Sequence, residues 1–153
     1  MPSHERRPVR VAVDTNVFVS GLIQRRGWPA VVLREWRKRH IDLVVSASQF
    51  AELTEVLRRE RIQIRYNISV SRADHLVRRL ARTVVSDGSA DFRFIVRDRD
   101  DAVILYTAIE QGVNFLVSGD QDLLVIANAI AEIGLNIVTP RQFAEAFGLE
   151  RAK

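Results

Sequence analysis

The chain contains no cysteine, and only three of its 153 residues are histidine. Without cysteine there can be no disulfide framework, no thiolate zinc site and no catalytic thiol. The histidines His4, His40 and His75 are scattered without the spacing of zinc ligands. No segment is long and apolar enough to cross a membrane, and the N-terminus lacks the apolar stretch of a signal peptide. These absences favour a cytoplasmic protein without a cysteine- or histidine-based site.

Basic residues outnumber acidic ones, 23 against 19, and the formal net charge is +4. Many of the basic residues are arginines in short clusters, at residues 25–26, 34–39, 58–61 and 78–79. Such clusters are more often solvated helix faces than binding sites. Beside an acidic pocket, however, a basic surface suits a polyanion whose backbone is held by arginine and lysine.

Predicted strands and helices alternate along the chain, which implies an α/β fold with a parallel sheet covered on both faces. We expect one domain over residues 9–148, preceded by a loose tail over residues 1–8. The predicted strands cover residues 9–13, 41–45, 84–85, 114–117 and 136–138, with a strand or loop over 92–96. The predicted helices cover residues 16–24, 30–40, 46–60, 71–83, 97–111, 121–132 and a last helix from 139, while 62–67 form a polar connection.

Two of these helix starts carry the pattern of a capping box. Ser46 is followed three residues later by Gln49, and Thr139 is followed by Gln142 with Pro140 just inside the helix. In a capping box the side chain of the capping residue accepts a hydrogen bond from the backbone N–H of the third helical residue. The side chain of that third residue in turn accepts from the backbone N–H of the capping residue. We therefore expect helices to begin directly after these two residues.

Two aspartates directly follow predicted strands. Asp14 ends the strand over 9–13, and Asp120 follows the strand over 114–117 after a short turn. The carboxyl ends of parallel strands form the ligand crevice of such a sheet, so both side chains are expected at the same edge. Aspartate also serves often in turns and helix caps, and for either residue alone that role is the more common one.

Further acids stand on predicted helices. Glu52 lies close to the apolar face of its helix, where a charged group is costly unless it has a partner. Asp98, Asp100 and Asp101 surround a later helix start, and three acids exceed what capping needs. Asp101 falls inside the first turn and is expected to point over the strand ends, with Asp98 and Asp100 as competing registers.

Carboxylates that gather in one place repel each other and persist only by taking up protons or holding a cation. A set of carboxylates and waters points to Mg²⁺ or Mn²⁺. Such an ion lowers the pKa of a bound water and stabilises charge on a scissile phosphate. If the acids converge, the sequence predicts a site that acts on phosphodiesters, and its four principal members are Asp14, Glu52, Asp101 and Asp120.

Four segments that carry these acids resemble motifs of the PIN-domain ribonucleases, which include the VapC-type toxins. They are VAVDTNV over 11–17, the helix from Ser46 through Leu57, RDRDDA over 97–102 and FLVSGDQDLL over 115–124; TPRQF over 139–143 also fits. Each motif is short, but their order and spacing together are fairly specific. The resemblance extends over nearly the whole chain, from about residue 10 to 147.

The resemblance implies a three-layer α/β/α sandwich with a parallel, roughly five-stranded sheet. It also implies endonucleolytic cleavage of RNA with Mg²⁺ or Mn²⁺ as the cofactor. By position the ligand roles go to Asp14, Glu52, Asp101 and Asp120, with Asp98 and Asp122 as auxiliaries. Thr15, Asn16 and Ser118 are expected to support the site by hydrogen bonds to ligand carboxylates or to metal-bound water.

For partners, the resemblance implies an RNA substrate, a homodimer and, for a toxin, a small antitoxin protein that blocks the pocket. A non-catalytic domain that binds RNA or a protein partner is the alternative, although none of the four acids is missing. A phosphotransfer domain such as a receiver would need a supporting lysine late in the chain. That domain ranks low, because Lys38 and the terminal Lys153 are the only lysines and Arg141 follows the last strand.

Overall fold

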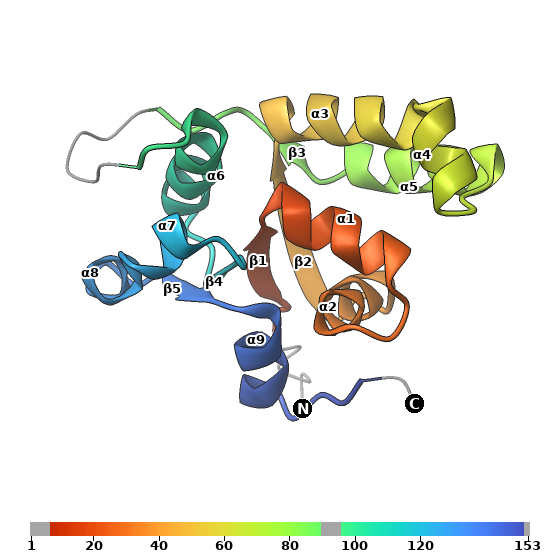
Figure 1. Cartoon of the computed structure of the whole chain (residues 1–153). Coiled ribbons are helices and arrows are strands. Elements are labelled where there is room, and N and C mark those ends of the chain that lie inside the picture. Colours follow the sequence, from red (N-terminus) through yellow and green to blue (C-terminus); the bar gives the residue numbers. More distant parts are fainter. Residues whose placement is uncertain (1–6, 90–95, 152–153) are drawn as a thin grey trace, which may run out of the picture.

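A five-stranded parallel sheet forms the centre of the structure (Figure 1). The computed structural model describes residues 7–89 and 96–151. Within these residues the strand order is β3-β2-β1-β4-β5, and each neighbouring pair is parallel. The strands are β1 (Val9–Val13), β2 (Ile41–Ser46), β3 (Val84–Val85), β4 (Phe115–Val117) and β5 (Asn136–Val138). The predicted α/β fold is confirmed.

Helices cover the sheet on both sides (Figure 1). None of the described helices has the length and apolar content to cross a membrane. The helices are α1 (Thr15–Ile23), α2 (Trp28–Arg37), α3 (Ala47–Arg58), α4 (Glu60–Arg65), α5 (Val70–Ala81), α6 (Arg99–Glu110), α7 (Gln121–Leu124), α8 (Ala127–Ala131) and α9 (Pro140–Ala146).

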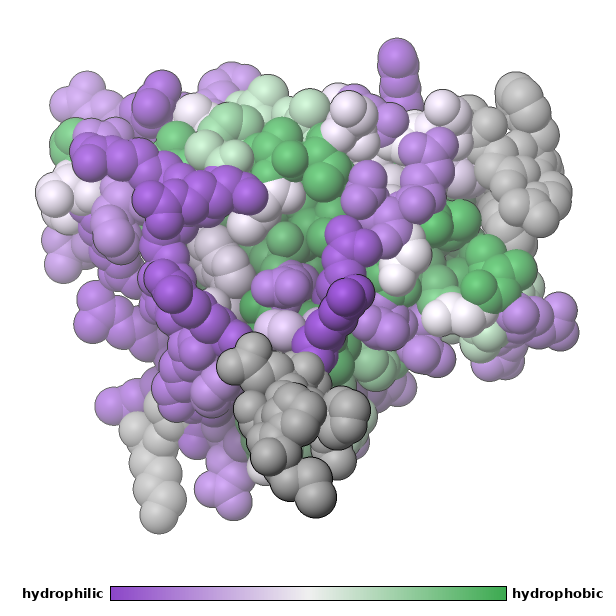
Figure 2. Space-filling model, turned by 180° about the vertical axis from the view of Figure 1, so that it is seen from behind, coloured by the Kyte–Doolittle hydropathy of each residue, from purple (hydrophilic) through white to green (hydrophobic). Residues whose placement is uncertain are grey.

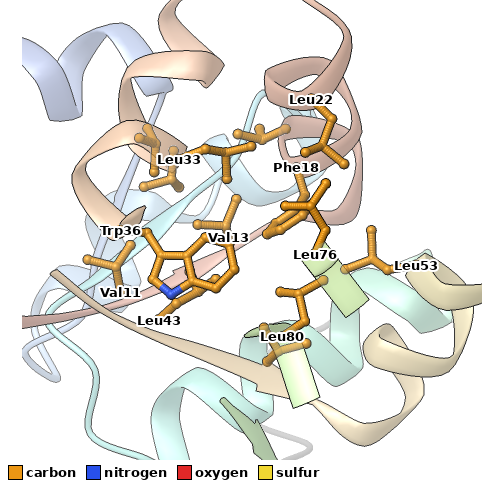
Figure 3. Packing of buried hydrophobic residues seen from close by; sticks show 14 of the residues in the cluster. Val11, Val13, Phe18, Leu22, Leu33, Trp36, Leu43, Leu53, Leu76 and Leu80 are labelled. Atoms are coloured by element: carbon orange, nitrogen blue, oxygen red, sulfur yellow. The ribbon is translucent and has the colours of Figure 1, made fainter. Parts of the chain in front are cut away.

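The central strands are buried on both faces, which explains their continuous apolar runs. Val11 and Val13 of β1 face a large core that includes Phe18 of α1 and Trp36 of α2 (Figure 3). The Phe18 and Trp36 rings meet edge to face, with centroids 6.0 Å apart. Ala12, between the two valines, faces a second core beneath α6, α7 and α8. The sheet is therefore packed against helices on both sides.

Two predicted segments differ from the structure. The polar connection over 62–67 is wrong, because residues 60–65 form α4, which begins after the extended backbone of Arg59. The single helix predicted over 121–132 is also wrong. It is divided into α7 and α8 around Ile126, whose φ of −94° and ψ of 5° interrupt the helical path. Neither break contains glycine or proline, so no local signal marks them.

Helix starts follow the expected caps in two different ways. At α9, Thr139 and Gln142 form the complete capping box, with both reciprocal hydrogen bonds present. At α3, the Ser46 hydroxyl accepts from the Gln49 backbone as predicted. The Gln49 side chain instead donates to the Val13 carbonyl and ties α3 to β1. The segment predicted over 92–96 and the tail over 1–8 lie largely outside the described residues.

Candidate metal centre

Three aspartates from three separate parts of the sequence converge at the carboxyl edge of the sheet. Asp14, Asp101 and Asp120 each offer a carboxylate oxygen, and these oxygens lie within 4.8 Å of one another. Asp14 and Asp101 are buried, and Asp120 is partly buried. We call this group the inner acids. Their separation suits oxygens that share a hard divalent cation, whose own ligand distances are about 2.0–2.6 Å.

Each inner acid at a strand end also serves as a helix cap. The Asp14 carboxylate accepts from the Asn16 backbone at 3.3 Å at the start of α1. The Asp120 carboxylate accepts from the Asp122 backbone at 2.8 Å at the start of α7. These bonds leave further carboxylate lone pairs available, because an ionised carboxylate has about four acceptor sites. Capping and ion binding are therefore compatible roles at the same residue.

Ser118 joins two of the inner acids. Its hydroxyl donates to Oδ2 of Asp14 at 2.8 Å and accepts from the Asp120 backbone at 3.0 Å. The Ser118 side chain is fully buried, and the backbone of Asp14 donates to the Val117 carbonyl at 2.9 Å. The ends of β1 and β4 are thus locked together, and the orientation of the Asp14 carboxylate is set by a buried donor.

The structure separates the roles of the three aspartates at the start of α6. Asp98 is the cap, because its carboxylate accepts from the backbones of Asp100 and Asp101 at 2.8 and 3.1 Å. Asp100 is exposed, whereas Asp101 is buried and lies among the inner acids. Of the competing registers, only Asp101 therefore places its carboxylate beside Asp14 and Asp120.

The inner acids are in electrostatic conflict without a cation. The pKa of Asp101 is raised to about 7, first by burial and then by the negative charges of Asp14 and Asp120, a side-chain hydrogen bond with Asp120 and the charge of Asp98. A divalent cation would reverse this preference, because it stabilises the ionised form of every carboxylate around it. The donor set is all oxygen, which matches the preference of Mg²⁺ and Mn²⁺.

Glu52 lies beside the inner acids but is not one of them. It is exposed on α3, and its pKa is raised by desolvation first and then by Asp100, Asp14 and Asp98. Glu52, Asp98 and Asp100 therefore form a second layer of charge, which we call the outer acids. Glu52 and Asp100 line a small cleft together with Thr15 and Gln49.

The remaining predicted residues occupy different positions. The buried Thr15 hydroxyl has no hydrogen-bond partner among the described residues, although it directly follows Asp14. An orphaned buried hydroxyl costs free energy unless water or an ion-bound ligand satisfies it, so it favours an occupant at this edge. Asn16 and Asp122 are exposed, and Asn16 lines the hollow described next.

A hollow of about 450 Å³ opens beside the inner acids, and we call it the acidic hollow. Asp14 and Asp120 form its acidic wall, while Ser20, Pro29 and Pro140 form part of the remainder. The hollow is broad and open to solvent, which suits an extended substrate better than a small enclosed molecule. The Gln49 side chain donates to the carbonyl of Val13, the residue before Asp14, and so helps to position this strand end. The sequence did not predict this role, because the capping-box pattern assigned the Gln49 side chain to its own helix.

The fold and the inner acids together define a class: an α/β domain with a carboxylate site at the carboxyl end of a parallel sheet. The model of the PIN domain family matches residues 10–122, and the chain belongs to that family. PIN domains are generally nucleases that act on RNA with divalent metals. The uncharacterized protein MJ1680 of Methanocaldococcus jannaschii is similar to this chain, 26% identical over 153 residues that cover 96% of this chain and 97% of the relative.

Proposed function

We propose that this protein is a metal-dependent endoribonuclease in which Asp14, Asp101 and Asp120 bind Mg²⁺ or Mn²⁺. The observation that carries the proposal is the approach of their three oxygens to within 4.8 Å in a partly buried site. Three carboxylates would otherwise repel each other and would also repel a phosphodiester. A divalent cation removes both repulsions, so that a phosphodiester can approach the three carboxylates.

A bound Mg²⁺ or Mn²⁺ supplies an acidified water and stabilises the charge that develops on the scissile phosphate. The residues of the chain supply the geometry. Ser118 fixes the Asp14 carboxylate, and Asp101 projects from the first turn of α6 against it. Glu52 approaches from α3 and completes the predicted ligand set from the outer side, with Asp98 and Asp122 as auxiliaries. We expect Thr15 and Asn16 to hydrogen-bond water near the ligands.

The test is cleavage of defined RNAs by the purified protein with Mg²⁺, with Mn²⁺ and with excess chelator. Cleavage should require metal, and Asp14→Asn should abolish it while circular dichroism shows an intact fold. Asparagine is also a good helix cap, so the start of α1 is preserved in this variant. Full activity in chelator or in Asp14→Asn contradicts the mechanism. RNA binding without turnover, across several metals and several RNA substrates, would favour a non-catalytic binding domain.

We further propose that the nuclease is one domain over residues 9–148 and acts as the toxin of a toxin–antitoxin pair. The support is the resemblance of its motifs to those of VapC-type toxins. A small DNA-binding protein encoded directly upstream, which binds this chain and inhibits cleavage, is the expected antitoxin. Light scattering should give the mass of a homodimer. A neighbouring region without such a reading frame argues against the toxin role but leaves the nuclease proposal untouched.

A further inference from the structure

Four arginines meet in a second hollow, away from the acids. This hollow has a volume of about 320 Å³ and lies against α1, α2 and α5. We call it the arginine hollow, and its basic lining residues are Arg25, Arg34, Arg37 and Arg72. A basic face on a single helix would explain Arg34 and Arg37 alone. Arg25 follows α1 and Arg72 stands on α5, so the tertiary fold brings the charges together.

The charges of the arginine hollow are poorly compensated. Arg34 lies 3.8 Å from Glu35, but no ion pair among the described residues joins Arg25, Arg37 or Arg72 to a carboxylate. Partial desolvation lowers the pKa of Arg37, and the positive charges of its arginine neighbours lower it further. Like charges in such proximity cost free energy, and a bound anion would offset that cost.

The basic surface continues beyond this hollow. Arg37 also lines a larger recess over β2, β3 and α5. Figure 2, which views the molecule from behind, shows hydrophilic side chains around a recess on this face whose floor is more hydrophobic. Asp42 is the acidic residue among the described residues that line it, and the additional arginines are Arg10, Arg39, Arg78, Arg79 and Arg82. Arg37 therefore links the arginine hollow to this larger, arginine-rich recess.

The arginine hollow and the acidic hollow adjoin the same two helices. Ser20 and Pro29 line the acidic hollow, and the residues that follow them, Gly21 and Ala30, line the arginine hollow. Helix α1, with 9 residues, starts beside Asp14 and ends shortly before Arg25. Its length is therefore about 14 Å at 1.5 Å per residue. A strand with the phosphate spacing of one strand of a double helix, about 3.4 Å, covers that distance in about four nucleotides.

We propose that the arginine hollow binds the phosphodiester backbone of the RNA at a point about four nucleotides from the bond that is cleaved. The identity of the ligand as RNA rests on the proposed function. Guanidinium groups bind phosphate oxygens in a bidentate manner, which suits an all-arginine lining. A protein partner would be expected to use apolar anchors as well. None of the described large apolar side chains that are highly exposed lines this hollow.

RNA binding in the absence of cleavage tests the proposal directly. Fluorescence anisotropy with a labelled single-stranded RNA of about 20 nucleotides is measured in chelator across a salt series. The variant Arg37→Gln/Arg72→Gln should bind about 10-fold or more weakly, and its salt slope should fall by about 1.4, since each phosphate contact contributes about 0.7. Arg25→Gln, which removes an exposed side chain, should lower the slope by about 0.7 and guards against misfolding of the double variant.

The matched control is Arg58→Gln/Arg61→Gln, which removes the same charge from exposed positions on α3 and α4 outside both hollows. It should change RNA affinity by about 2-fold or less. Equal losses in the two double variants would overturn the proposal, because only net charge would then matter. Tighter binding of polyglutamate than of RNA, lost in Arg37→Gln/Arg72→Gln, would also overturn it in favour of an acidic protein.

Cleavage kinetics separate this proposal from the nuclease proposal. For the long RNA, Arg37→Gln/Arg72→Gln should raise KM and leave kcat unchanged. For an RNA too short to span both the acidic hollow and the arginine hollow, the variant and the wild type should have the same KM and the same kcat. If no RNA is cleaved while the arginine variants still lose binding, the nuclease proposal fails and the binding site stands. If cleavage is normal and both double variants lose the same amount of binding, the nuclease proposal stands and the binding site at the arginine hollow is wrong.

Discussion

The inner and outer acids share one edge of the sheet but differ in how the fold holds them. The inner acids, Asp14, Asp101 and Asp120, come from two strand ends and one helix turn and converge to within 4.8 Å. The outer acids, Glu52, Asp98 and Asp100, are exposed, and Asp98 is engaged as a helix cap. The chemical groups are the same in both sets, so their positions alone separate three carboxylates that could hold a cation together from three that are exposed to solvent.

Burial explains why this difference matters. An exposed carboxylate can turn toward water and away from its neighbours, which screens its charge. Asp14 cannot do so, because Ser118 holds its carboxylate and the side chain is only 2% exposed. The inner acids therefore keep their mutual repulsion until a cation or a proton arrives. Variants that remove one member from each set will show whether the two sets differ in function as they differ in burial.

The largest effect is expected from Asp14→Asn. This substitution should lower metal-dependent RNA cleavage by more than about 100-fold, because loss of a ligand should exceed the 10- to 100-fold cost of losing a second-shell partner. Asp98→Asn is the matched control in the outer set, since asparagine retains the cap of α6. It should keep most of the activity. Comparable losses in the two variants would remove the distinction between inner and outer acids.

An intermediate effect is expected from Glu52→Gln. The side chain is exposed and outside the inner acids, yet the negative charge of Asp14 helps to raise its pKa. Cleavage should fall by about 10-fold, with the metal concentration for half-maximal activity shifted upward, because negative charge at the outer side helps to hold the cation. Glu60→Gln, an exposed position on α4, serves as the control. Unchanged cleavage in Glu52→Gln would confine the site to the inner acids.

Ser118→Ala should raise the metal concentration needed for half-maximal cleavage by about 10-fold, in the range typical of second-shell partners. The substitution removes the donor to Asp14 and the acceptor of the Asp120 backbone, without removing a ligand. Saturating metal should restore most of kcat. Ser71→Ala, at an exposed position on α5, controls for serine removal. A loss of kcat that metal does not rescue would indicate damage to the fold and not to the orientation of Asp14.

The smallest effect concerns stability in the absence of metal. The pKa of Asp101 is about 7 in the folded protein and 3.8 as its ordinary value, so the folded state holds more protons between these limits. Stability should therefore be highest below about pH 4 for this group and should decline as pH rises through about 7. Thermal unfolding of the metal-free protein should show this decline, and Asp101→Asn should remove much of it. An Asp101→Asn profile that matches the wild type would contradict the assignment.

The fold could be predicted from the sequence where the hydrophobic pattern agrees with the turn and capping residues that bound it. The strand over 9–13 and the helix cap at Thr139 are examples, because the buried run and the capping residues are local signals. The start of α4 at Glu60 and the break at Ile126 could not be predicted. Both depend on how apolar side chains pack against the rest of the protein, and that packing cannot be read from the neighbouring residues in the sequence.

The site was predictable only in part. The parallel-sheet rule places Asp14 and Asp120 at one edge, and the structure has them there. The sequence could not tell which aspartate among residues 98–101 caps α6 and which joins the inner acids, because any of them can cap a helix. Only the observed backbone φ and ψ identify Asp98 as the cap. The arginine hollow was beyond prediction, since Arg25 and Arg72 meet only through the packing of α1 and α5 beside α2. The catalytic roles themselves stay predictions.

The most direct test of the central claim is Mn²⁺ binding followed by electron paramagnetic resonance, with no RNA present. The wild type, Asp14→Asn, Asp101→Asn and Asp120→Asn are compared with the outer variants Asp98→Asn and Asp100→Asn. We predict that each inner substitution weakens Mn²⁺ binding strongly, while each outer substitution changes it little. Tight binding retained in all three inner variants, or lost equally in the outer ones, would contradict a metal centre built on Asp14, Asp101 and Asp120.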